Sequence, residues 1–208
     1  MNTDWEAQRK WRQGCEDQWG APEYIDLWDF VHNGRELRGV MPVRKFPRLL
    51  EGLPEQPLVE SMQDLRADGK GAVWFEIQGY TKVGQRSGLR LKVQARIDLV
   101  CQRCLDIMCL DVLEQAEFDV VTQAQMDQMD QEELDPDEPE MLVGSRQFDL
   151  FELIEDQLIL AVPYVPKHDN CGKQQGASSD RSVNDMDPEQ VDAKRNPFEV
   201  LKRLKGQQ

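Results

Sequence analysis

Two short motifs, far apart along the chain, carry residues that could together bind a metal ion. Cys101 and Cys104 form a CxxC pair, and His168 and Cys171 form an HxxC pair. Three thiolates and one imidazole are a donor set that completes a tetrahedral structural zinc site. The two pairs can meet only if the chain after Pro166 returns to the CxxC turn. A structural zinc ion is therefore the one cofactor that the residues suggest.

The CxxC pair also has two interpretations that involve no metal. A redox-active pair normally opens a helix in a thioredoxin-like βαβ unit, which lowers the pKa of its thiols. Here the pair follows one extended segment and leads into another. In the plainest interpretation Cys101 continues a buried strand face, Cys104 lies in a turn, and neither has a chemical role. The zinc, thiol-active and structural interpretations all remain open at this point.

Few other residues suggest catalysis. The sequence contains no Walker loop, dinucleotide-binding fingerprint, nucleophile elbow or HExxH motif. Glu155 and Asp156 are neighbouring carboxylates, but simple helical periodicity turns both toward solvent, and no His, Ser or Arg accompanies them. We therefore expect no enzymatic activity, no catalytic residues and no small-molecule substrate.

The stretch from Leu89 to Val121 must position the CxxC pair. From Leu89 to Leu99 apolar and polar residues alternate strictly, which is typical of a half-buried strand because successive side chains point to opposite faces. A second extended segment follows the pair. We therefore predict a long central hairpin of two antiparallel strands, joined at or near the CxxC turn.

The remaining patterns indicate an α+β fold. They predict an antiparallel sheet, either open or barrel-like, that is covered by an amphipathic helix over 149–161. Asp149 with Glu152 three residues later fits a capping box at the start of that helix, and Pro163 ends it. The predicted strands lie near 37–43, 73–80, 89–100 and 106–121.

This fold accounts for the middle of the chain, and polar segments flank it. We expect a single α+β domain over 25–171, interrupted by a flexible acidic loop over 127–140. The segments outside this domain are expected to be a flexible N-terminal extension over 1–24, a flexible linker over 172–195 and a C-terminal amphipathic helix over 196–205.

The charge of the chain limits the partners it can have. Its 208 residues carry a net charge of −14, which argues against general nucleic-acid binding, because phosphate neutralisation needs clustered Lys and Arg. Basic residues nevertheless gather in two places. The plainer interpretation of each group is a solvated surface, and the sharper interpretation is contact with RNA or a partner. The residues concerned are Arg38, Arg44, Lys45, Arg48, Arg90, Lys92 and Arg96.

Hydropathy bears on location. No apolar run approaches the roughly 18–20 residues that a membrane-spanning helix needs, and the first twenty residues lack the apolar core of a secretory signal. We therefore expect a cytoplasmic protein without membrane contact, in which the five cysteines are thiols or ligands rather than disulfides.

Several of these pieces, in this order, resemble the bacterial YceD family, the large ribosomal RNA subunit accumulation proteins. The matching stretches are VCQRCLD (100–106), FDLFELIEDQLILAVPYVPKHDNC (148–171) and NPFEVLKRLK (196–205), and RELRGVMPVRKFPRL (35–49) is similar to the opening segment of the family. The resemblance implies a non-enzymatic factor that supports synthesis, processing or stability of large-subunit ribosomal RNA. It also implies a partner, either a ribosomal RNA precursor or a ribosome-assembly or RNA-processing protein. The alternative is a zinc-bearing or thiol-active protein that uses Cys101 and Cys104.

Overall fold

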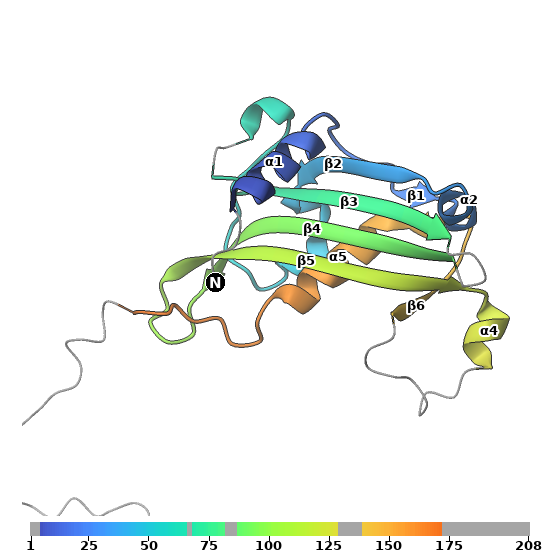
Figure 1. Ribbon diagram of the computed structural model, residues 1–208. Coiled ribbons are helices and arrows are strands. Elements are labelled where there is room, and N and C mark those ends of the chain that lie inside the picture. The colour runs from blue at the N-terminus through green and yellow to red at the C-terminus, as the bar shows by residue number, and fades with distance from the viewer. Residues whose placement is uncertain (1–4, 66–67, 82–86, 129–138, 172–208) are drawn as a thin grey trace, which may run out of the picture. The chain divides into compact units, whose positions relative to one another are not determined.

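A five-stranded sheet forms the centre of the computed structural model, which describes residues 5–65, 68–81, 87–128 and 139–171. Its strands lie in the order β2 (Glu36–Pro42), β3 (Ala72–Thr81), β4 (Ser87–Val100), β5 (Ile107–Val121) and β6 (Glu140–Val143). The first four run antiparallel in turn, and β6 runs parallel to β5 (Figure 1). The structure confirms a mixed α+β class with a mostly antiparallel sheet. The sheet is open, with β2 and β6 at its edges, so the barrel-like alternative is wrong.

The long hairpin of β4 and β5 carries the CxxC turn at its tip. The register runs from Gly88 opposite Asp119 to Val100 opposite Ile107. At the tip the Leu105 N–H donates to the Cys101 carbonyl (2.8 Å), and Leu105 adopts a φ of 63°. A branched side chain avoids this left-handed region unless the surroundings hold it there. The turn is therefore tightly folded back on Cys101.

The main hydrophobic core lies between one face of the sheet and α5 (Leu150–Ala161). The alternating apolar residues of β4, from Leu89 to Leu99, point into it. Asp149 begins α5, since its side chain accepts from the Glu152 N–H (2.9 Å). The short elements α2 (Leu27–His32), η1 (Val43–Lys45) and α3 (Pro47–Leu50) also contribute side chains to this core. A two-stranded ladder of β1 (Tyr24–Ile25) and β7 (Phe148–Asp149) adjoins the start of α5.

The opposite face of the sheet is also covered. Helix α1 (Trp5–Cys15) lies across it, and Cys15 is buried in a second cluster with Val40, Ala72 and Trp74. The Trp11 Nε1 donates to a Glu76 carboxylate oxygen (2.7 Å). The expectation of a flexible extension over 1–24 therefore misses an ordered helix. Trp11 and Cys15 lie four positions apart and pack on the second cluster, but the rest of this short helix is mostly polar, so its apolar face is narrow in the sequence.

Residues Met1–Cys171 form one compact unit. The minor elements within its described part are η2 (Met62–Asp64) and α4 (Gln123–Asp127). Most of the predicted acidic loop over 127–140 lies outside the described residues, as do the predicted linker over 172–195 and the predicted helix over 196–205. Among the described residues, no helix is both long enough and apolar enough to span a membrane.

Candidate metal centre

The four predicted ligand residues lie together at the tip of the β4–β5 hairpin. One donor atom from each of Cys101, Cys104, His168 and Cys171 lies within 4.8 Å of all the others. The Sγ atoms of Cys101 and Cys171 are 3.7 Å apart, and the Cys104 Sγ is 3.4 Å from the His168 Nδ1. The Cys171 Sγ is 3.9 Å from the same nitrogen. The chain after Pro166 does return to the CxxC turn.

These separations fit one small ion among the four donors. Zinc binds thiolate sulfur at about 2.3 Å and imidazole nitrogen at about 2.0 Å, so tetrahedral angles separate two such donors by about 3.5–3.8 Å. The described separations of 3.4, 3.7 and 3.9 Å lie close to this range. Four protein donors would fill the coordination shell and leave no open position for water or substrate, which is the arrangement of a structural rather than a catalytic zinc site.

Backbone hydrogen bonds bring the two pairs together. Val162 and Pro163 end α5, and the extended segment after them reaches the hairpin tip, where the Gln102 N–H donates to the Pro166 carbonyl (2.9 Å). The His168 N–H points at the Cys101 Sγ (3.4 Å). The strand pair therefore supplies one half of the site, and the segment after the helix supplies the other.

The surroundings shift the pKa values of the Cys101 and Cys104 thiols in opposite directions. Burial raises the pKa of the Cys101 thiol, but the backbone N–H groups of His168 and of two residues in the turn outweigh it and lower that pKa to about 5. At Cys104 the backbone N–H of Asp106 lowers the pKa, but burial and the nearby sulfurs of Cys101 and Cys171 raise it further than that. The close approach of the sulfurs thus opposes ionisation of all three thiols together. A divalent cation among them would offset the repulsion between the thiolates.

Arg103, between the two cysteines of the CxxC pair, contacts the donor group, and the sequence analysis did not single it out. Its Nε donates to the Cys171 Sγ (3.0 Å), and an Nη donates to the His168 carbonyl (2.8 Å). Three thiolates around a divalent cation carry a net charge of −1, which this guanidinium offsets. The signal was a basic residue inside the motif, but the sequence alone could not show which way it points.

The other two cysteines do not join this group. Cys15 is buried beneath α1, where its Sγ contacts the Phe75 carbonyl (3.5 Å). Cys109 lies on β5, and burial is the main cause that raises its pKa. The motif spacing in the sequence therefore distinguishes the clustered thiols from the isolated ones.

The predicted RNA-contact or partner-contact residues fall into two groups rather than one surface. Arg90, Lys92 and Arg96 lie on the strand face that α1 covers. Carboxylates or rings already engage them: Arg90 contacts Glu117 (2.8 Å), the Arg96 Nε lies 2.5 Å from Asp111, and the Lys92 Nζ is 4.4 Å from the Trp11 ring centroid. Arg38 on β2 contacts Glu36 in the same way.

The second group lies on η1 and α3, which pack toward α5. Arg44 contacts Glu60 (2.8 Å), and Arg48 contacts both Glu155 (2.9 Å) and Asp156 (2.8 Å). Lys45 is exposed, and within the described part of the chain no ion pair involves it. Most of the predicted contact cations are therefore balanced by acidic neighbours.

Glu155 differs from its predicted position. It is only 6% exposed, and its carboxylate accepts from the Arg48 N–H (2.7 Å), the Leu49 N–H (3.0 Å) and the Arg48 Nε (2.9 Å). The expectation that it faces solvent is wrong, because the side chain turns to satisfy the first N–H groups of α3. Both oxygens are engaged in holding α3, which leaves Glu155 a structural role.

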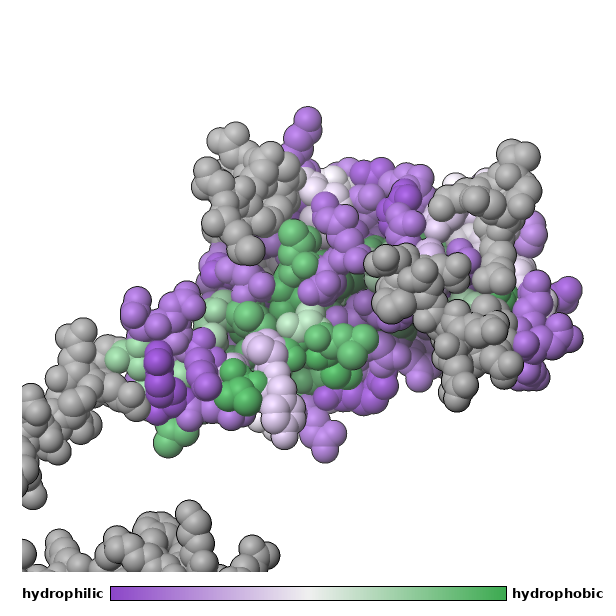
Figure 2. All heavy atoms as spheres, turned by 60° about the horizontal axis from the view of Figure 1, so that its bottom comes forward, coloured by the Kyte–Doolittle hydropathy of each residue, from purple (hydrophilic) through white to green (hydrophobic). Residues whose placement is uncertain are grey.

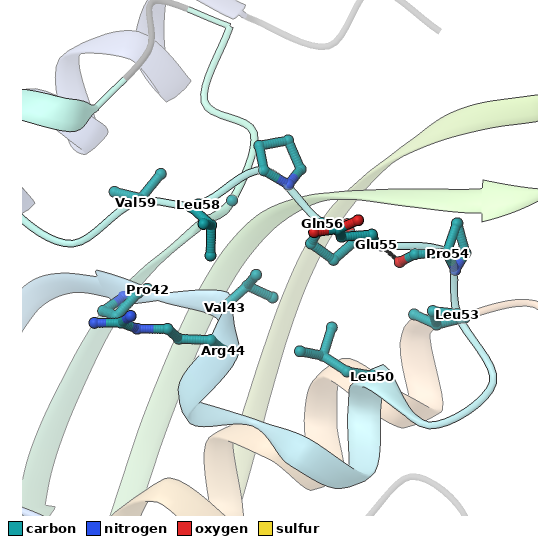
Figure 3. A pocket seen from close by; sticks show the side chains of 12 residues that line it. Pro42, Val43, Arg44, Leu50, Leu53, Pro54, Glu55, Gln56, Leu58 and Val59 are labelled. Atoms are coloured by element: carbon teal, nitrogen blue, oxygen red, sulfur yellow. Dashed lines mark hydrogen bonds between the residues drawn. The ribbon is translucent and has the colours of Figure 1, made fainter.

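A cavity of about 260 Å³ lies between the end of β2 and the chain that follows α3. Figure 3 shows Val43, Leu50 and Leu58 pointing toward one another across it, with Arg44 beside Pro42. The lining is mostly apolar, and its one basic residue pairs with Glu60. It is smaller than most small-molecule sites and lacks converging polar groups.

Comparison with known proteins identifies the family. The model of the family described as "Large ribosomal RNA subunit accumulation protein YceD" matches residues 89–205, a stretch that contains all four clustered donors. A Haemophilus influenzae protein with that same name is 32% identical over 150 residues, which are 71% of this chain and 80% of the relative. No solved structure matches. The resemblance seen in the sequence is thereby confirmed, and the chain belongs to the YceD family of large ribosomal RNA subunit accumulation proteins.

Proposed function

We propose that this protein supports the synthesis, processing or stability of large-subunit ribosomal RNA in the cytoplasm. In this proposal it acts by binding, either to a ribosomal RNA precursor or to an assembly or processing protein, and it catalyses no reaction. Zinc, held by Cys101, Cys104, His168 and Cys171, would fasten the segment after α5 to the β4–β5 hairpin. The observation that carries the proposal is the family membership together with the name of the relative.

The chemistry of the described residues is consistent with a binding role. The four clustered donors leave no position for a substrate, and Glu155, the most buried carboxylate considered for acid–base work, is bound to α3. The metal centre instead joins two segments that are 64 or more residues apart, as structural zinc sites do. What it holds rigid is the surface at the hairpin tip.

The first experiment is the ratio of large-subunit to small-subunit ribosomal RNA in cells depleted of the protein. We expect a selective fall in the large-subunit RNA that the wild-type chain restores. A chain with Cys104→Ser should restore it less well than one with Cys109→Ser, because only Cys104 belongs to the donor group. An unchanged ratio under several growth conditions would refute the proposal.

Substitutions of the basic residues test whether the protein contacts RNA directly. Lys45 and Arg44 are replaced together by Glu, and Arg90 and Lys92 are replaced together in a second variant, because the two groups lie on different faces of the sheet. With direct contact, one variant weakens binding to a large-subunit precursor RNA, and the dependence of log K on log salt becomes shallower by about 0.7 for each contact that is lost. Unchanged binding in both variants would leave a protein as the partner.

A thiol-active protein is the second candidate, favoured by one observation. The pKa of Cys101 is lowered to about 5, although burial raises it, because several N–H groups face its sulfur. A thiolate at neutral pH is a nucleophile. The candidates differ in metal content: a thiol-active pair would be metal-free and reactive after purification under reducing conditions, whereas the zinc site would protect Cys101 from alkylation.

A further inference from the structure

One edge of the sheet is only partly covered. Strand β6 pairs with Phe118–Val121 at one end of β5. Within the described ranges, no strand pairs with the outer side of Ile107–Glu117, which we call the open edge. Alternate residues of an edge strand direct their N–H and C=O groups away from the sheet. The open edge therefore presents a row of main-chain donors and acceptors.

An apolar surface adjoins this edge. Helix α5 packs against β5, and near its end Ile159 and Leu160 are 37% and 72% exposed. Figure 2, which brings the underside of Figure 1 forward, shows hydrophobic residues gathered in the middle of this face and hydrophilic ones around them. An added strand could pair with β5 and lay alternate side chains on such a surface, as in recognition by strand addition.

The charges of the open edge disfavour a second copy of this chain as the occupant. The edge carries Asp111, Glu114 and Glu117 and no basic residue. Antiparallel pairing with itself would bring these carboxylates together, and like charges on facing strands are destabilising. Each copy also has a net charge of −14. These charges protect the edge against self-association and favour a basic strand.

The face toward α5 defines the side chains that such a strand needs. Asp111 and Glu117 pair across the ladder with Arg96 and Arg90 on the α1 face. Glu114 lies opposite Val93, whose side chain is in the main core, so Glu114 is on the same face as α5. Leu110 shares this face and is only partly buried. A strand with an apolar residue and a basic residue four positions apart, and therefore on the same face, would meet both.

We propose that the open edge of β5 binds an extended segment of a partner protein, with Lys or Arg and apolar residues on the side that faces α5. The main chains pair, an apolar side chain rests near Leu110, and a cation meets Glu114. This surface lies outside the metal centre. The inference goes beyond the proposed function and does not depend on the ribosomal RNA role.

The test measures amide hydrogen exchange of the full chain by NMR, with a synthetic peptide of about ten residues that carries Val and Lys four positions apart on one face and Thr on the other. In the free chain we expect alternate amides of Ile107–Glu117 to exchange quickly. The peptide should slow their exchange by about tenfold or more at saturation. A peptide that is N-methylated at every second residue should have an affinity at least about tenfold lower, and so should a peptide with Glu in place of Lys.

Matched proline variants test the edge from the side of the protein. Glu114→Pro and Gln115→Pro alter adjacent exposed residues, whose N–H groups point to opposite sides of β5. One of the two substitutions removes a hydrogen bond to β4 and should lower the melting temperature. The other, the outward proline variant, removes only an N–H that points away from the sheet and should leave the melting temperature nearly unchanged. The outward proline variant should have about tenfold lower affinity for the peptide.

Four outcomes would overturn the inference. Equal binding of the N-methylated peptide would mean that the peptide does not form hydrogen bonds with the main chain of β5. Slow exchange of all edge amides in the free chain would mean that another segment of the chain already covers them. A dimer that the outward proline variant dissociates would make a second copy the occupant, and protection of the same amides by a precursor RNA, but not by the peptide, would make the edge an RNA surface.

Discussion

The residues of the metal centre show what spacing in a sequence can and cannot establish. Two pairs with three-residue spacing indicate two half-sites, because each pair reaches one ion from a single turn. Whether the halves meet depends on a return of the chain after α5, which periodicity does not encode. The structure supplies it through the hydrogen bond from Gln102 to Pro166. Arg103 was unpredictable for a similar reason, since its role depends on which way the turn faces.

Removal of one ligand should abolish metal binding without affecting an isolated thiol. For Cys104→Ser we expect the zinc content after purification under reducing conditions to fall from about one ion per chain to a small fraction of that. Cys109→Ser, which alters a cysteine outside the donor group, should keep the ion. Metal analysis and melting temperature measure both variants, and equal results for the two would show that the cluster binds no structural metal.

Arg103 should tune the affinity of the site rather than create it. With Arg103→Ala the Cys171 sulfur loses its guanidinium donor, so we expect the zinc Kd to rise about 10- to 100-fold, as for other partners that orient metal ligands. The zinc Kd of Arg103→Lys should lie between those of wild type and Arg103→Ala, because lysine keeps the positive charge but lacks the planar set of donors of the guanidinium. Arg146→Ala removes an equal charge at an exposed position near β7. Competition with a chromophoric chelator gives all the constants, and a similar rise for Arg146→Ala would reduce the effect to net charge.

At the scale of elements, the sequence predicts best where one period dominates. The predicted strands at 73–80, 89–100 and 106–121 correspond to β3, β4 and β5, because apolar residues recur at alternate positions along most of each sequence. The predicted helix over 149–161 corresponds to α5. Helix α1 was missed because it meets the polar face of the strands through residues such as Arg12, which donates to Gln94 (2.8 Å). Such polar contacts add no hydrophobic signal to the narrow apolar face that Trp11 and Cys15 form.

The joint between α3 and α5 gives a prediction with an internal control. Glu155→Ala leaves the N–H groups of Arg48 and Leu49 without their acceptor, in a buried place. We expect it to lower the free energy of unfolding by about 2–4 kcal/mol. Asp156→Ala removes the other carboxylate that contacts Arg48, but that side chain is 48% exposed, so the loss should stay below about 1 kcal/mol.

Urea denaturation of the two variants measures this difference. Adjacent residues and a shared Arg48 make the pair a matched comparison, since both changes remove one negative charge from the same helix. A result in which both variants lose the same free energy would mean that the arginine, and not the N–H groups of α3, accounts for the role of Glu155.

The whole molecule has an acidic net charge, and most of the basic residues predicted to contact RNA or a partner form ion pairs. The net charge is −14, and ion pairs engage Arg38, Arg44, Arg48, Arg90 and Arg96. Among the described residues at these positions, few cations are left to release counterions from RNA. This charge balance is consistent with the proposal that the protein acts through a protein partner rather than by direct RNA contact.

The hydrophobic cluster beneath α1 makes the stability of the whole molecule depend on pH in the alkaline range. Burial between α1 and the sheet raises the pKa of the Cys15 thiol from 9.0 to about 12. Between these values the unfolded chain releases this proton while the folded chain keeps it. The folded state then binds more protons, so its stability is complete below pH 9 and falls as the pH rises, by up to about 1.4 kcal/mol per pH unit.

The difference between wild type and Cys15→Ala isolates this effect from other alkaline titrations. We expect the free energy of unfolding of wild type to fall more steeply between about pH 9 and pH 11 than that of the variant, in urea denaturation series at each pH. The Cys15 thiol should also resist alkylation at pH 8 until the chain unfolds. Parallel pH profiles for the two proteins, or rapid alkylation of Cys15 in the folded chain, would mean that α1 does not seal this face of the sheet in solution.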